Sequence, residues 1–188
     1  MKKGIKVLLL SDTWATLGLG MIGPIYAIFV ENIGGDILDA SWAYFAFLIS
    51  SGIVMYLISH WEDRVKHKER LITLGYCLAS LGALSYYFVD SQLTLVMTQI
   101  ILGLSEAVLV PAYDALYSKY LTKHNVASEW GNWESMRYIV TAGSVLIGGY
   151  LAYHFGFKFL FLVMFGISLL SVFSSLYLYK GKKFLSKV

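Results

Sequence analysis

Charged residues, cysteine and proline are scarce in this chain of 188 residues. Asp, Glu, Lys and Arg make up 14% of the chain, against about 25% in soluble domains, whereas 57% of the residues are hydrophobic. This composition predicts an integral membrane protein whose surroundings are a lipid bilayer. The single cysteine, Cys77, lies in an apolar run, and one cysteine excludes an internal disulfide.

The sequence also lacks the signatures of cofactors, metals and enzymes. It contains no Gly-rich phosphate loop, no His-Glu-x-x-His zinc motif and no Gly-x-Ser-x-Gly nucleophile elbow, and its four histidines do not have metal-ligand spacing. We therefore expect neither a cofactor nor an enzymatic activity. The net charge of +3 comes from short basic patches between apolar runs, which argues against nucleic acid as a partner.

Long apolar runs are abundant. A helix that crosses a bilayer needs about 20 mostly apolar residues, because the hydrocarbon core is about 30 Å thick and each residue rises about 1.5 Å. Six segments meet this requirement: residues 5–30, 40–59, 71–89, 92–121, 128–154 and 157–179. They are too long and too continuous for barrel strands, so the predicted fold is an all-α bundle of six transmembrane helices in a single domain, residues 1–188.

Basic residues gather in alternate connections between these segments. They are Lys2, Lys3, Lys6, Arg64, Lys66, Lys68, Arg70, Lys119, Lys123, Lys180, Lys182, Lys183 and Lys187. The opposite connections carry several acidic residues and only one basic residue, Lys158. Because positively charged loops stay on the cytoplasmic side, we expect both termini in the cytoplasm and the protein in the plasma (inner) membrane.

Aromatic residues are frequent near the ends of the predicted segments. Examples are Trp42, Tyr44, Tyr86, Tyr87, Tyr117, Tyr120, Trp130, Trp133 and Tyr153. Amphipathic rings favour the depth of the lipid headgroups, so we expect these residues to anchor the helices there.

The connection after the second segment carries a motif. It reads Ser59-His-Trp-Glu-Asp63-Arg64-Val-Lys66-His67-Lys68. This resembles the loop signature of the major facilitator superfamily, Gly-x-x-x-Asp-Arg-x-Gly-Arg-Arg or Lys. Serine and lysine replace the two glycines, and histidine stands at one of the arginine positions.

Later segments carry further partial motifs in the family's order. Gln99-Ile-Ile-Leu-Gly103 is similar to the family's Arg-x-x-x-Gly pattern on helix 4, with glutamine in place of arginine. Gly148-Gly149 and the following Phe155-Gly156-Phe157-Lys158-Phe159 resemble the family's Gly-Gly and Gly-Trp-Arg sequences. Ser144-Val145 stand where the antiporter signature has Gly-Pro, so the resemblance does not imply antiport.

The resemblance covers one six-helix half, similar to the N-terminal half of a family member. Complete members have twelve helices in two halves related by an axis along the membrane normal. One half supplies one wall of a central cavity, so the resemblance implies a parallel homodimer or pairing with a separately encoded second half. The implied function is secondary active transport of a small molecule by alternating access. The alternative is a non-transporting membrane assembly or accessory protein derived from such a half.

Three ionisable side chains fall inside the predicted membrane segments: Asp12, Glu106 and Arg137. A charge there costs about 2.5 to 3.5 kcal/mol on insertion scales, so each is a candidate for substrate or proton binding. Glu106 and Arg137 are expected at similar depth on neighbouring helices, either as an ion-paired clamp or as binding groups. Asp12 is either a binding group or a solvated carboxylate at the membrane boundary. Glu106 or Asp12 would carry the protons if transport is proton-coupled.

A partly polar stripe runs along the fourth segment. Gln99, Glu106 and Tyr113 recur on one face at steps of three and four residues, together with Gly103 and Val110. The family lines its cavity with helices 1 and 4, so this stripe is either a substrate-facing wall or a packing surface.

Charges at the cytoplasmic side form a second candidate group. Asp63, Arg64 and Lys68 lie in the motif loop, and Asp114 and Glu134 lie near the cytoplasmic ends of the fourth and fifth segments. In the family this loop forms a cytoplasmic gate through charge pairs between helices.

Small residues on the fifth segment predict close contact between helices. Gly143, Ser144, Gly148 and Gly149 allow backbones to approach one another in lipid. The family places helix 5 at the contact between halves, so we expect the dimer interface on the second and fifth segments.

Overall fold

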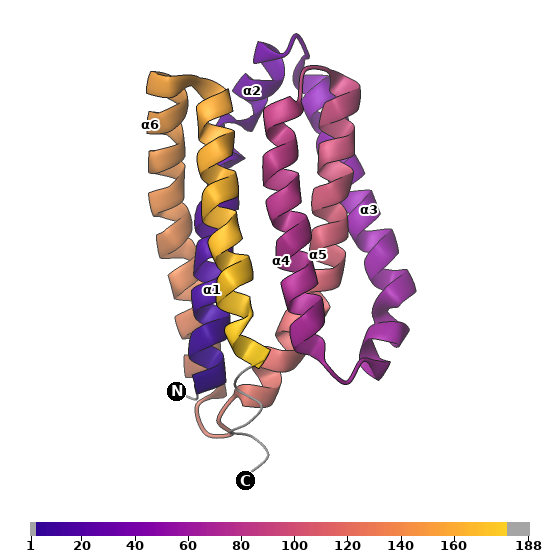
Figure 1. Ribbon diagram of the computed structural model, residues 1–188, viewed down its shortest axis with the longest axis vertical. Helices are drawn as coiled ribbons and strands as arrows, with labels where there is room; N and C mark the ends of the chain where they lie inside the picture. The colour runs from indigo at the N-terminus through magenta and orange to yellow at the C-terminus, as the bar shows by residue number, and fades with distance from the viewer. Residues whose placement is uncertain (1–2, 180–188) are drawn as a thin grey trace.

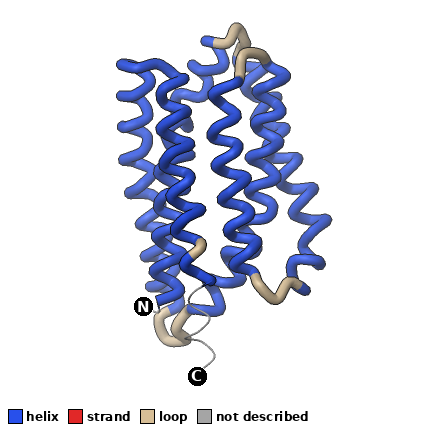
Figure 2. The backbone as a smooth tube through the Cα atoms, in the orientation of Figure 1, coloured by secondary structure: helices blue, strands red, loops and turns tan. Residues whose placement is uncertain are grey.

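Five segments in the computed structural model, which describes residues 3–179, are long and apolar enough to cross a membrane. They are Gly4–Asn32, Ile37–Arg64, Lys68–Phe88, Gln92–Tyr120 and Val126–Tyr179. Their helices are α1 (Lys3–Leu19), η1 (Gly20–Ile25), α2 (Tyr26–Asn32), α3 (Ile37–Arg64), α4 (Lys68–Ser85), η2 (Tyr86–Phe88), α5 (Gln92–Tyr120) and α6 (Val126–Ser175). Residues 3–179 contain no strand, and helices run along the long axis of the molecule (Figure 2). The protein is an integral, multi-pass, all-helical membrane protein.

The fifth segment is far longer than the others because α6 reverses direction within it. Gly156 has a φ of 79° and a ψ of 168°, which breaks the helix at a conformation that glycine adopts readily. Residues 126–155, the first arm, and residues 157–175, the second arm, therefore stand side by side (Figure 1). The arms correspond to the two separate segments predicted from the sequence at 128–154 and 157–179.

The first segment is interrupted near its middle. Between α1 and α2, residues Gly20–Ile25 form the 3-10 turn η1, which contains Pro24. Proline has no backbone N–H and cannot continue an α-helix without disruption. The structure accordingly breaks the first segment here into two helices, α1 and α2.

Helix α1 lies between the two arms of α6, and small residues allow this. A Cβ on Gly18 would lie 2.6 Å from the Ser168 hydroxyl of the second arm. On the other side, Gly148 of the first arm contacts the backbone carbonyl of Met21, and Ser144 is fully buried. Ser144 and Gly148 thus serve packing within the chain and not the dimer interface expected for them. Gly149, by contrast, faces open space.

Several aromatic residues expected at the lipid headgroups are packed inside the protein instead. Tyr86, Tyr117 and Trp133 are 3%, 0% and 7% exposed. The anchoring prediction is wrong for them, because their rings pack on neighbouring helices. Trp42 and Tyr153 are 57% and 85% exposed, as residues facing the surroundings must be.

Helix α3 is the most exposed span of the bundle. It packs along α5, and its end diverges from the other helices toward the lower edge of the view (Figure 1). Side chains such as Tyr56 and Leu57 are 78% and 69% exposed. The α3–α4 connection, the start of α1 and the end of the second arm all lie at this lower end of the bundle (Figure 1). Among the basic residues used for orientation, Lys2, Lys180, Lys182, Lys183 and Lys187 lie outside the described residues.

Candidate functional site

A cavity of about 440 Å³ opens among the end of α1, η1, α2, α3, η2, α5 and the second arm of α6. Twelve residues line this cavity: Leu19, Ile22, Gly23, Tyr26, Tyr44, Phe47, Tyr86, Gln99, Leu102, Ser105, Glu106 and Met164. The break at η1 exposes Gly23 to the cavity, and α5 supplies its polar wall. Of the predicted binding residues, Gln99 and Glu106 are therefore in this cavity.

Gln99 connects three parts of the fold. Its side chain is 5% exposed, and its Nε2 donates hydrogen bonds of 2.9 Å to the hydroxyls of both Tyr26 and Tyr86. These bonds join α5 to α2 on one side and to η2 on the other. The sequence did not single out either tyrosine for this role, because nothing in the pattern separates them from interfacial aromatic residues.

Glu106 faces the cavity as an exposed carboxylate. Within residues 3–179 it forms no hydrogen bond or ion pair. Arg137 lies within electrostatic range, but its ion pair joins Glu134, with 3.8 Å between the charged atoms. The ion pair expected between Glu106 and Arg137 is thus replaced by a local pair on the first arm.

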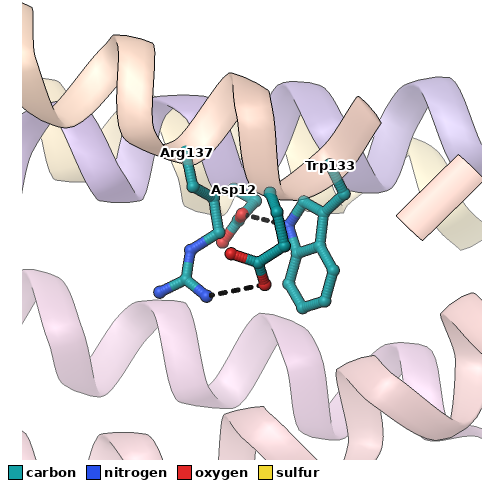
Figure 3. Close-up of polar contacts among 4 residues, drawn as sticks. Asp12, Trp133 and Arg137 are labelled. Atoms are coloured by element: carbon teal, nitrogen blue, oxygen red, sulfur yellow. Dashed lines mark hydrogen bonds and ion pairs between the residues drawn. The ribbon is translucent and has the colours of Figure 1, made fainter. Parts of the chain in front are cut away.

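The predicted residue Asp12 belongs to a second polar group. Trp133 Nε1 donates a 2.6 Å hydrogen bond to Asp12 Oδ2, and the Arg137 guanidinium lies 5.5 Å from the centre of the Trp133 ring. Figure 3 shows these three side chains extending from α1 and the first arm of α6 toward one another. We call Asp12, Trp133, Arg137, Glu134 and Tyr113 the Asp12 cluster.

Tyr113 lies in this cluster and does not line the cavity. It is 3% exposed and stacks on Trp133 with 5.1 Å between ring centres and 27° between ring planes. Its hydroxyl has no hydrogen-bond partner within residues 3–179. The polar stripe predicted on α5 is therefore divided: Gln99 and Glu106 face the cavity, and Tyr113 packs among aromatic rings.

The predicted gate residues form two separate sets. Asp63 and Arg64 are exposed in the last turn of α3 and not in a loop, and Lys68 Nζ donates a 3.1 Å hydrogen bond to the backbone carbonyl of Glu62. Asp114 lies within electrostatic range of Arg137 and Glu134 on the first arm. In the described part of the chain, no hydrogen bond or ion pair joins these two sets.

Metal ligands do not gather in the described structure. Within residues 3–179, no group of three or more His, Cys, Asp or Glu side chains is placed to hold a metal ion. The cavity offers an amide, tyrosine hydroxyls and the carboxylate of Glu106, which can bind a ligand through hydrogen bonds and charge. The Asp12 cluster offers a carboxylate that accepts a hydrogen bond from an indole.

Sequence comparisons find several proteins that are similar to this chain. The chain is 24% identical over 141 residues to the uncharacterized MFS-type transporter YitZ of Bacillus subtilis, covering 75% of this chain and 85% of that protein. It is 23% identical over 158 residues to the uncharacterized MFS-type transporter MJ1560 of Methanocaldococcus jannaschii, covering 84% of this chain and 41% of the relative. It is also 25% identical over 155 residues to the quinolone resistance protein NorA of Staphylococcus aureus, covering 81% of this chain and 39% of that protein.

These relatives point to transport and not to an enzymatic activity. The chain spans about two fifths of the length of the second and third relatives and most of the first. The Major Facilitator Superfamily profile matches residues 8–187, which confirms the resemblance seen in the motifs. The chain belongs to the major facilitator superfamily.

Proposed function

We propose that the protein is a secondary active transporter that moves a small molecule by alternating access. The observation that carries this proposal is the cavity of about 440 Å³ inside a membrane-spanning bundle, with Gln99 and Glu106 on its wall. Pockets for small molecules measure about 300 to 1,000 Å³ and combine apolar walls with a few polar groups. The family of the chain supports the same function.

We infer six membrane crossings with both termini of the chain in the cytoplasm. The reversal at Gly156 supports counting each arm of α6 as a crossing. Basic residues of the α3–α4 connection and of the α5–α6 connection stand at one end of the bundle, and acidic residues such as Glu31 and Asp36 stand at the other. This charge distribution supports a cytoplasmic lower end in a plasma membrane.

Two six-helix units would complete the cavity. We infer either a parallel homodimer or pairing with a second six-helix half, because one unit encloses the cavity on one side only. The exposed faces of α3 and of the first arm, where Gly143 and Gly149 meet open space, support these helices as the contact between units. Mass measurement in nanodiscs should find two units per particle, whereas single units at high concentration would contradict this pairing.

Alternating access can be tested without knowing the substrate. Replacing Cys77 by Ala leaves no cysteine, and Phe47→Cys then places a single thiol in the cavity. We expect a membrane-impermeant thiol reagent to label this position from either side of the membrane, because the cavity opens alternately. As a control, Ile139→Cys, on a side chain that is 73% exposed outside the cavity, should react slowly from both sides. Labelling of position 47 from one side only would contradict alternating access.

The gate proposal uses the same assay. We infer that the basic residues Arg64 and Lys68, which neighbour Asp63, approach Asp114 and Glu134 when the cytoplasmic side closes, because opposite charges attract across a short gap. Asp63→Asn should then change the ratio of inward-facing to outward-facing labelling. An unchanged labelling ratio would contradict a role for Asp63 in the gate and would leave it only local contacts at the α3–α4 connection.

We propose that proton coupling runs through Glu106, on the cavity wall, or through Asp12, in the Asp12 cluster. Substrate flux into proteoliposomes should respond to an imposed pH gradient, and Glu106→Gln or Asp12→Asn should remove that response. Flux that ignores the gradient in the unmodified protein would exclude proton coupling.

A further inference from the structure

The cavity has an unusual charge balance. Among its twelve lining residues, Glu106 is the only charged one, and no lysine, arginine or histidine is present. Glu106 also has no hydrogen bond or ion pair within the described residues. A carboxylate without a partner is costly in the middle of a membrane-spanning helix, so a cation in the cavity would gain from meeting it.

The surroundings of Glu106 add to this negative charge. Its electrostatic neighbours are two further carboxylates, Asp12 and Asp114, and one guanidinium, Arg137. Arg137 is already shared, because it pairs with Glu134 and lies over the Trp133 ring. Carboxylates therefore outnumber cations around the cavity, which disfavours an anionic ligand.

The walls of the cavity are suited to an apolar body. Tyr44 and Phe47 on α3 are stacked, with 5.7 Å between their ring centres and 19° between their planes, and both line the cavity. Leu19, Ile22 and Met164 complete an apolar wall. Aromatic faces attract organic cations, whereas an uncharged polyol would need many free hydrogen-bonding groups.

The amide of Gln99 does not change this balance. Its Nε2 is already engaged by the hydroxyls of Tyr26 and Tyr86. The amide and the two hydroxyls are neutral, so the charge on the cavity wall is that of the Glu106 carboxylate.

We propose that the cavity binds an organic cation with an apolar or aromatic body, with Glu106 neutralising the charge and the α3 rings holding the body. This proposal rests on the proposed transport function and names its substrate class. In the parallel homodimer, the twofold axis would give the shared cavity a second Glu106. The site would then be completed by the same residue from the other copy.

The test uses two ions of matched shape and opposite charge. Tetraphenylphosphonium and tetraphenylborate each carry four phenyl groups, so they differ mainly in the sign of the charge. Equilibrium dialysis against the protein in nanodiscs, with empty nanodiscs subtracted, should show saturable binding of the cation and none of the anion. Equal saturable binding of both ions, or of neither, would overturn the proposal, and this comparison uses the unmodified chain.

Variants then measure how much the charge of Glu106 and the ring of Phe47 contribute to binding of the cation. Glu106→Gln should weaken binding of the cation about tenfold or more, because it removes the partner charge from a partly desolvated site. Glu106→Asp should retain most of the binding. The matched control is Glu31→Gln, which removes an exposed carboxylate outside the cavity and should change affinity less than about twofold. Phe47→Leu keeps an apolar side chain but removes the ring, and should weaken binding about threefold.

The outcomes separate substrate class from transport. A folded Glu106→Gln protein that binds the cation like the unmodified protein would overturn the proposal, with folding checked by gel filtration and circular dichroism. Charge-dependent binding in a protein whose position 47 is labelled from one side only would support the cation site and refute transport.

Discussion

The Asp12 cluster and the cavity are both polar regions inside one helical bundle, but their polar groups are held differently. In the cluster, the carboxylate of Asp12 is bonded to the Trp133 indole, and aromatic rings stack around the pair. In the cavity, the Glu106 carboxylate has no partner within residues 3–179 and faces open space. Along the first span, Asp12 lies within α1, whereas the cavity is lined from Leu19 onward by the end of α1 and by η1. From this difference we expect the cluster to stabilise the bundle and the Glu106 carboxylate to be available to the proposed ligand.

The largest expected effect concerns the ring at the centre of the cluster. Trp133→Ala removes a 7% exposed side chain that stacks on Tyr113 and bonds Asp12, so the free energy of unfolding should fall by about 3 to 5 kcal/mol. Titration with SDS in mixed micelles, followed by circular dichroism, measures this. Trp42→Ala is the matched control, because Trp42 is 57% exposed and should cost below about 1 kcal/mol. Equal losses in the two variants would break the comparison.

The carboxylate of the cluster should have the next largest effect. Asp12→Ala leaves the Trp133 N–H without its acceptor, and we expect a loss of about 2 kcal/mol in the free energy of unfolding. Asp12→Asn keeps an acceptor oxygen and should cost about half as much. The same SDS titration compares the variants. An alanine variant as stable as the unmodified protein would show that the cluster is not a stabilising group.

The contact beside η1 tests the boundary between the regions. A Cβ on Gly148 would press on the backbone carbonyl of Met21, so Gly148→Ala should cost about 1.5 kcal/mol through strain. Gly149→Ala, one residue away, meets nothing within 4 Å and should be nearly neutral. Thermal unfolding in detergent distinguishes them. If Gly149→Ala is the more harmful change, the open side of the first arm is an interface in the preparation that is measured.

The smallest stability effect is expected in the cavity. Gln99→Leu removes two hydrogen bonds of 2.9 Å, but the Tyr26 hydroxyl lies beside the cavity and can bind water, so the loss should be about 1 kcal/mol. Gln92→Leu, at the start of the same helix, is the control. A loss as large as that of Trp133→Ala would mean that the cavity wall is as structural as the cluster.

Much of the fold could be predicted from the sequence because long apolar runs in lipid leave few alternatives to helices. The predicted segment 92–121 corresponds to α5 at Gln92–Tyr120 almost residue for residue. The second segment was predicted too short: α3 continues to Arg64, because charged residues at a helix end can extend beyond the apolar core. Hydropathy therefore located the spans better than their ends.

The candidate site was predicted in part. Helical spacing correctly placed Gln99 and Glu106 on one face of α5, and the cost of buried charge singled out Asp12 and Arg137. Spacing could not show that Tyr113 turns away from the cavity, because that depends on which helix packs beside it. The partners Tyr26, Tyr86 and Trp133 come from distant parts of the chain, and their aromatic character alone also fits interfacial anchoring.

Helix α1 has a consequence for how the protein is made. It lies between the arms of α6, with Gly18 against Ser168, so a span that is synthesised early packs on one that is synthesised more than a hundred residues later. Until α6 is synthesised, the carboxylate of Asp12 has no Trp133 to bond, although α1 has already entered the membrane. During biogenesis, the insertion machinery or water at the edge of the bilayer must therefore hydrogen-bond that carboxylate until the first arm, which carries Trp133, has been synthesised.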